Sequence, residues 1–201
     1  MKNLAVFSSG FGSNLQAIIN AVKKGKVKAN IALVISDNVD AYSLVRAKRA
    51  GIDFLYVDPD DFNDRTCYDK FIVKRLKKEK IDYVVLAGFM RIISDYFVRQ
   101  YKNRIINIHP ALLPSFKGTQ GIKDVLDYGV KVSGVTVHFV TNILDGGPVI
   151  LQNALAVKDD DTEVSLAERV HSLEHKLYPQ AIDLLVRGRL FVKGRKVFVK
   201  K

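Results

Sequence analysis

The sequence predicts an α/β fold in which a mostly parallel β-sheet has helices on both faces and is extended by antiparallel strands in the C-terminal half. In the first half of the 201-residue chain, short apolar segments alternate with amphipathic ones. Continuously apolar strands separated by helices are typical of parallel sheets that are covered on both faces. The second half has two longer strand-like segments around a glycine-rich turn, which favours antiparallel pairing.

Five apolar segments in the first half are expected to be strands, at residues 4–8, 31–36, 54–57, 83–86 and 105–108. The amphipathic segments between them predict helices at residues 15–24, 42–50, 68–79 and 95–101. In the first of these helices the apolar residues share one face at helical spacing; they are Leu15, Ile18, Ile19 and Val22.

In the second half, residues 132–140 and 148–157 flank the turn NILDGG and predict two antiparallel strands. A long helix is expected from about Thr162 to Leu185, because Asp161-Thr162-Glu163 supplies N-terminal capping chemistry. Residues 187–201 alternate apolar and basic side chains around a glycine and predict a short hairpin. The sequence shows no internal repeat or Pro/Ser-rich linker, so we expect a single domain over residues 1–201.

The composition is that of a globular protein, with 48% hydrophobic and 26% charged residues. No apolar run approaches the roughly 20 residues that a membrane-spanning helix needs. The apolar stretch near the start leads directly into a glycine turn, which indicates a first strand rather than a signal peptide. The single cysteine, Cys67, excludes an intramolecular disulfide and a multi-thiolate zinc site. We therefore expect a cytoplasmic protein that does not associate with membranes.

The net charge of +11 raises the possibility of nucleic-acid binding. Seven basic residues and no acidic ones lie in residues 187–201, so most of the excess belongs to the predicted hairpin. Aromatic platforms for bases are sparse there, with Phe191 and Phe198 the only candidates. A solvated basic face is the simpler interpretation, and a nucleic-acid-binding α/β protein stays as an alternative.

The segment SSGFGSN, residues 8–14, joins the first predicted strand to the first predicted helix. Such a turn exposes backbone N–H groups at the positive end of a helix dipole, which suits a phosphate. Gly10 and Gly12 permit close approach of a ligand, and Ser13 and Asn14 add side-chain donors. The segment is not a dinucleotide fingerprint, because Leu15 stands where the third glycine would be. A tight turn without a ligand is the structural alternative.

The segment RIINIHP, residues 104–110, places two polar residues at the end of an apolar strand. Asn107 and His109 project to the same side because side chains alternate along a strand. In parallel sheets ligands bind beyond the carboxyl ends of the strands. Each residue alone could be structural, as a hydrogen-bonded core histidine or a turn asparagine. Together they mark a candidate site.

Two further segments contain candidate polar groups. Asp145 precedes two glycines, in a loop that can bring its carboxylate to a histidine and favour the imidazolium form. His138 shares a strand face with Thr136 and could be purely structural. HSLEH, residues 171–175, matches a zinc-peptidase pattern through His171 and His175, but no suitable downstream carboxylate follows. Glu174 and His175 could instead contribute to a site built elsewhere.

Taken together, these segments resemble the folate-dependent glycinamide ribonucleotide formyltransferase family of purine synthesis. The similarity extends over nearly the whole chain, through SSGFGSNLQA, LAGFMRI, NIHPALLPSFKG, TVHFV, LDGGPVILQ and the EH and YP pairs of the last helix. It implies a Rossmann-like sheet and a single formyltransferase domain. Residues 1–100 would form the phosphate-binding half, residues 101–186 the catalytic and folate half, and residues 187–201 the basic hairpin.

The resemblance also implies substrates and residue roles. The substrates are 10-formyltetrahydrofolate and phosphoribosylglycinamide, with no metal, no nicotinamide and no nucleic acid, and the protein is expected to be a monomer or homodimer. The ribonucleotide phosphate is expected at Gly12, Ser13 and Asn14, and its glycinamide amine at Glu174. The formyl-folate is expected at Arg65, Met90, Arg91, Ile92, Ile93 and Asn107. The implied catalytic residues are Asn107, His109 and Asp145.

In that interpretation Asn107 and a protonated His109 donate hydrogen bonds to the oxygen of a tetrahedral intermediate, and Asp145 keeps His109 protonated. The chain departs from the family pattern at Gly121-Ile122 and at His171. Formyltetrahydrofolate hydrolases and other formyltransferases share the same catalytic residues and are the nearest alternatives. A nucleotide-dependent oxidoreductase with Asp37 as its ribose-binding residue is a third.

Overall fold

The computed structural model describes residues 1–200 and contains one mixed β-sheet. Within these residues the strand order is β3-β2-β1-β4-β5-β6-β7-β9-β8. The strands are β1 Lys2–Phe7, β2 Ala29–Ser36, β3 Phe54–Tyr56, β4 Tyr83–Leu86, β5 Ile105–His109, β6 Val132–Phe139, β7 Val149–Ala156, β8 Leu190–Lys193 and β9 Lys196–Val199. Strands β1 to β5 are parallel, β6 pairs antiparallel with both β5 and β7, and β7 pairs parallel with β9. The predicted fold class is confirmed.

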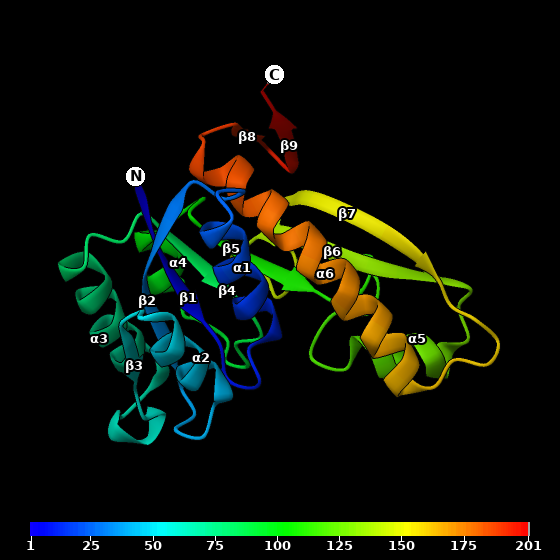
Figure 1. Ribbon diagram of the computed structural model, residues 1–201, viewed down its shortest axis with the longest axis horizontal. Helices are drawn as coiled ribbons and strands as arrows, with labels where there is room; N and C mark the ends of the chain where they lie inside the picture. The colour runs from blue at the N-terminus through cyan, green and yellow to red at the C-terminus, as the bar shows by residue number, and fades with distance from the viewer. Residues whose placement is uncertain (201) are drawn as a thin grey trace.

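Helices cover both faces of the sheet, as Figure 1 shows. They are α1 Ser13–Lys23, α2 Tyr42–Ala50, α3 Arg65–Lys78, α4 Asp95–Gln100, α5 Gly121–Tyr128 and α6 Glu163–Val186, with a 3-10 turn, η1, at Pro59–Asp61. One core cluster packs α1, α5 and α6 against residues such as Val6, Val85 and Ile106. A second packs α3 and α4 against Phe7, Leu86 and Ile105. Alternate residues of the same strands therefore enter different cores, which explains their continuous apolarity.

Helices α3 and α5 differ most from the sequence-based prediction, whereas the bounds of the other helices agree within two residues. Helix α3 begins at Arg65 rather than Tyr68, because the Asp64 carboxylate caps it by accepting the Cys67 N–H at 2.8 Å. Helix α5 was not predicted. It begins with a glycine and has no side-chain cap among the described residues, so the only local signal at its ends is Gly129, which follows Tyr128 in the left-handed conformation. Its formation depends on packing, since Val125 is completely buried in the core that also contains α6.

The strand register brings the candidate segments to one edge of the sheet. Phe7 of β1 pairs with Leu86 of β4, Leu86 pairs with Asn107 of β5, and Asn107 pairs with His138 of β6. The turn after β1 and the segment after β4 therefore start beside Asn107. The strand order reverses between β1 and β4, which makes this pair the topological switch point of the parallel part of the sheet. It lies next to Asn107 and His109 on β5.

The predicted C-terminal hairpin is present as β8 and β9, which pair antiparallel. The hairpin joins the rest of the sheet through one register pair, Val149 with Lys196. Phe191 and Phe198 are about half exposed on it, at 52% and 48%. Across residues 1–200, no helix combines the length and apolarity needed to cross a membrane.

Candidate active site

The turn before α1 presents backbone amides. Gly12 is the residue before the helix and has a φ of 73°, in the left-handed region. A Cβ at this position would lie 2.8 Å from the Ser43 Cβ, so only glycine fits without movement. No side chain among residues 1–200 caps α1. The first N–H groups of the helix are thus free to bind an anion, which adds to the favourable helix dipole.

Asn14 links this turn to α6. Its Nδ2 donates to Glu174 Oε2 at 2.8 Å, and both residues are buried. The same Glu174 oxygen accepts from His171 Nδ1 at 3.0 Å, and this hydrogen bond raises the pKa of His171. Asn14 Oδ1 is buried and has no partner among the described residues. A substrate donor that reached Asn14 would complete its hydrogen bonding.

The candidate folate segment follows β4. Met90 and Ile92 are 63% and 57% exposed, and the Arg91 guanidinium lies over the Tyr68 ring at 5.3 Å. Arg65, at the start of α3, is exposed. Burial raises the pKa of Asp69, and the positive charges of Arg65 and Arg91 oppose this effect. Ile93 instead packs against the second core. The structure therefore leaves Arg65, Met90 and Ile92 exposed and turns Ile93 inward.

The three catalytic candidates converge. His109 Nδ1 lies 3.6 Å from Asp145 Oδ2, and these side chains are only 3% and 8% exposed. Asn107 is on the same strand face as His109, as the alternation predicts. Its Nδ2 lies 3.4 Å from His138 Nε2, a long contact. An amide donor, an imidazole and a carboxylate thus occupy one region.

Both ring nitrogens of His109 have protein neighbours. Nε2 lies 2.7 Å from the Phe116 carbonyl oxygen. A carbonyl only accepts, so Nε2 must carry a proton here, and Nδ1 is the nitrogen that faces Asp145. For His109 to donate from Nε2 to a substrate, that proton has to exchange the Phe116 carbonyl for a substrate oxygen.

His138 is a site residue that the sequence reasoning left open. Its Nδ1 lies 2.9 Å from the Phe139 carbonyl oxygen and must donate to it. Burial lowers the pKa of His138, against an opposing effect of Asp145. A neutral ring with Nδ1 protonated has a lone pair on Nε2, which faces Asn107 Nδ2. His138 therefore orients the Asn107 amide with its donor side inward.

The loop between β6 and β7 carries Asp145 and folds tightly against the end of β6. A Cβ on Gly147 would collide with the Phe139 carbonyl oxygen, and one on Gly146 with Ile143. Asp145 itself has a positive φ of 48°. Its Oδ2 accepts the Gly118 N–H at 2.9 Å. The two glycines make this close return possible, and the Gly118 amide fixes the carboxylate beside His109.

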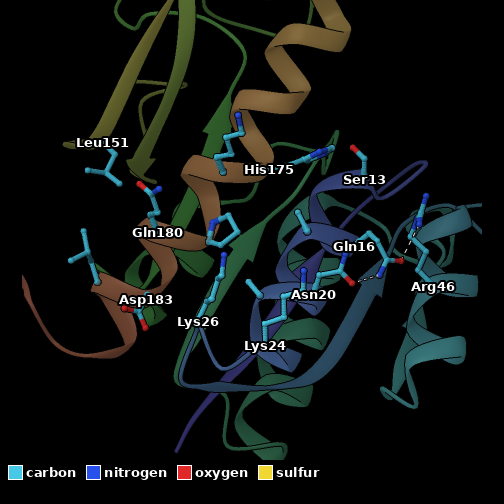
Figure 2. Close-up of a pocket in the computed structure, with 15 residues that line it drawn as sticks. Ser13, Gln16, Asn20, Lys24, Lys26, Arg46, Leu151, His175, Gln180 and Asp183 are labelled. Carbon is cyan, nitrogen blue, oxygen red and sulfur yellow. Dashed lines mark hydrogen bonds between the residues drawn. The ribbon is translucent and has the colours of Figure 1, made fainter.

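A groove of about 850 Å³ runs between α1 and α6 and opens beside Ser13. Figure 2 shows Lys24, Lys26 and Arg46 around it, with His175 near the Ser13 end. The groove adjoins the turn before α1 and is not lined by Asn107, His109 or Asp145. His175 lies in this groove, and its ring centroid is 6.5 Å from that of His171. Within residues 1–200, no group of three or more His, Cys, Asp or Glu is arranged to hold a metal ion.

Comparisons with known proteins agree with this architecture. Residues 2–182 match the formyl transferase family model. The chain is 44% identical to phosphoribosylglycinamide formyltransferase of Escherichia coli over 94% of this chain and 89% of that protein. It superposes on a glycinamide ribonucleotide transformylase from Symbiobacterium toebii with a TM-score of 0.98 and 45% identity, covering 100% of this chain and 95% of that one.

A larger relative matches as well. The chain is 42% identical to the trifunctional purine biosynthetic protein adenosine-3 of Drosophila melanogaster over 95% of this chain, but it spans only 14% of that protein's length. The family model and the full-length bacterial relative together cover nearly all of the described fold. The chain belongs to the formyl transferase family.

Proposed function

We propose that this chain transfers the formyl group of 10-formyltetrahydrofolate to the amine of phosphoribosylglycinamide. One observation carries the proposal: Asn107, His109 and Asp145 meet at the sheet edge that also holds the phosphate-type turn of Gly12 and Asn14. An acyl-transfer site needs donors for a developing oxyanion, and a phosphorylated acceptor needs an anion site nearby.

The ribonucleotide phosphate binds to the amides of Gly12, Ser13 and Asn14, which no side chain among residues 1–200 caps. Glu174 receives the amine end of the acceptor. The formyl-folate lies along Arg65 and residues 90–93, with backbone groups of Met90 to Ile93 toward the pterin. The two guanidiniums of Arg65 and Arg91 suit the anionic part of this donor.

In the reaction, the acceptor nitrogen attacks the formyl carbon and the carbonyl oxygen becomes negative. Asn107 Nδ2–H donates to this oxygen, with the amide orientation held by His138. His109 Nε2–H leaves Phe116 and donates as a second, charged group, while Asp145 stabilises the imidazolium. When the tetrahedral intermediate collapses, the C–N bond to the folate breaks. The proton lost by the attacking amine reaches the folate nitrogen through His109 or water, which balances the transfer.

This function requires only small-molecule substrates. We expect it to operate in the cytoplasm, in a monomer or homodimer, without a metal ion, nucleic acid or membrane. The basic groove beside Ser13 and the basic hairpin are compatible with anionic substrates.

The decisive experiment measures release of tetrahydrofolate from 10-formyltetrahydrofolate with and without phosphoribosylglycinamide. We expect release only with the acceptor, together with one equivalent of formylated ribonucleotide. Release that does not depend on the acceptor would assign the chain to the hydrolases instead. RNA binding that is lost on removal of residues 187–201, without formyl transfer, would favour the nucleic-acid alternative.

A further inference from the structure

Asp37 follows β2 directly and was considered above as a nucleotide-binding carboxylate. In the structure its Oδ1 accepts the Ser9 hydroxyl at 2.5 Å. Asp37 is only partly exposed, and the short contact directs its carboxylate to the turn after β1. This acidic group therefore has a partner within the chain, and its position beside two candidate substrate segments suggests a different role.

Ser9 connects three segments. Its Oγ accepts the Met90 N–H at 2.9 Å, and its own N–H donates to the Gly88 carbonyl at 2.9 Å. The Asn38 side chain donates to the Ser9 carbonyl at 3.1 Å. The turn after β1, the tip of β2 and the segment after β4 are thus joined at one serine.

The chemistry of the hydroxyl makes Asp37 important for this junction. A serine hydroxyl has one hydrogen and two acceptor lone pairs. An ionised carboxylate only accepts, so Asp37 takes the hydrogen and leaves lone pairs toward the Met90 N–H. Without Asp37 the hydroxyl can rotate and donate elsewhere, which weakens its hold on Met90.

The other end of the folate segment has its own attachment. The Ser94 N–H donates to Asp69 Oδ2 at 2.5 Å, and both residues are buried. Between the two attachments, Met90 and Ile92 are exposed. Loss of the Ser9 attachment would therefore release only the first part of residues 90–93, and the fold would remain.

We propose that Asp37 is a positioning residue for the formyl donor, acting through Ser9 to hold Met90 and the segment that follows it. This inference rests on the proposed function, since it assumes that residues 90–93 bind the folate. Because Ser9 lies in the same turn as Gly12 and Asn14, the link also sets the spacing between the two substrate sites.

The test compares Asp37→Ala, Asp37→Asn and the control Asp40→Ala. Asp40 is an exposed carboxylate in the same loop, and only its backbone N–H is hydrogen-bonded among the contacts of residues 1–200. For Asp37→Ala we expect the KM for 10-formyltetrahydrofolate to rise roughly fivefold, the effect of losing one hydrogen bond. The KM for the ribonucleotide should change less than about twofold. Asp37→Asn keeps an acceptor oxygen and should recover most of the loss.

Calorimetric titration with tetrahydrofolate separates this inference from the proposed function, because it requires no formyl transfer. Asp37→Ala should bind tetrahydrofolate roughly fivefold more weakly than the parent, and adding Ser9→Ala should weaken it little further, since both substitutions remove the same link. Unchanged binding in Asp37→Ala, or equal weakening in Asp40→Ala, would overturn the positioning role. Normal folate binding without transfer to phosphoribosylglycinamide would instead refute the proposed acceptor alone.

Discussion

The two halves of the candidate site use different parts of the chain. The turn before α1 offers backbone amides, and its conformation depends on Gly12 having no side chain. The region around β5 offers side chains on or beside a regular strand: the partly buried Asn107 and the buried His109 and Asp145 side chains. In the turn before α1, substitutions should therefore act by steric clash and backbone strain. In the region around β5, they should act by removing the chemical groups that the reaction needs.

The largest effect is expected in the side-chain half. Asn107→Ala removes a preorganised oxyanion donor and should lower kcat by roughly 10²–10³. Asp145→Ala removes the partner of His109 and should also lower turnover far more than ribonucleotide affinity. Steady-state kinetics and calorimetry with the ribonucleotide would measure both quantities. Asn153→Ala, on an exposed strand position, is the control, and near-normal turnover in either site variant would refute the assigned roles.

In the turn before α1, Gly12→Ala should lower stability and weaken ribonucleotide binding. An alanine in the left-handed region costs roughly 1–2 kcal/mol, and the new Cβ also meets Ser43. We expect a lower free energy of unfolding and a roughly tenfold higher KM for the ribonucleotide, equivalent to about 1.4 kcal/mol, with kcat little changed.

Gly25→Ala is a matched control for this substitution. Gly25 follows the same helix with a φ of +69°, but nothing lies within 4 Å of its would-be Cβ. It should show the backbone cost in urea denaturation without the KM effect. If both variants raise the KM equally, the turn has no special part in binding.

A smaller effect on kcat is expected when the Asn107 amide is kept but the group that orients it, His138, is changed. His138→Phe keeps an aromatic ring but removes the acceptor for Asn107, so kcat should fall roughly threefold to tenfold, the value of a neutral hydrogen bond. His138→Gln retains an acceptor and should be closer to the parent. Equal kcat values in the parent and His138→Phe would show that Asn107 needs no such support.

The smallest effect concerns the pH dependence of stability at the contact between the turn before α1 and helix α6, where Glu174 accepts from Asn14 and His171. The hydrogen bond to Glu174 raises the pKa of His171 above 6.5. Its stabilising contribution is therefore complete below pH 6.5 and is lost as the pH rises through the raised value. The difference in Tm between the parent and His171→Gln should be larger at pH 6 than at pH 8.5. A difference independent of pH would mean that protonation of His171 does not stabilise the fold.

Much of this molecule could be predicted from the sequence because its signals are local. Apolar runs identified the five parallel strands, and alternation placed Asn107 and His109 on one face. The Thr162 cap was also recognisable, and its hydroxyl accepts the Ser165 N–H at 3.2 Å. These features depend on residues that are close in sequence.

The features that were missed depend on distant contacts. Helix α5 needs the core around Val125, and Gly129 at its C-terminal end is the only local signal for it, with none at its start. The place of His138 in the candidate site depends on its contact with Asn107 of the neighbouring strand and on the loop that brings Asp145 within 3.6 Å of its ring. The partner of the Asp37 carboxylate is the Ser9 hydroxyl, which lies 28 residues earlier in the sequence, so no local pattern indicates this contact.

Tyr178 determines where Glu174 lies relative to the sheet. Its buried hydroxyl lies 2.7 Å from the Leu86 carbonyl and 3.1 Å from the Ile106 carbonyl, so it fastens α6 to the ends of β4 and β5. Glu174 stands one helical turn earlier, about 6 Å along the axis at 1.5 Å per residue. The distance between the Glu174 carboxylate and the ends of β4 and β5 is consequently set by a rigid helix. Insertions in the surrounding loops can change access to the site without changing this distance.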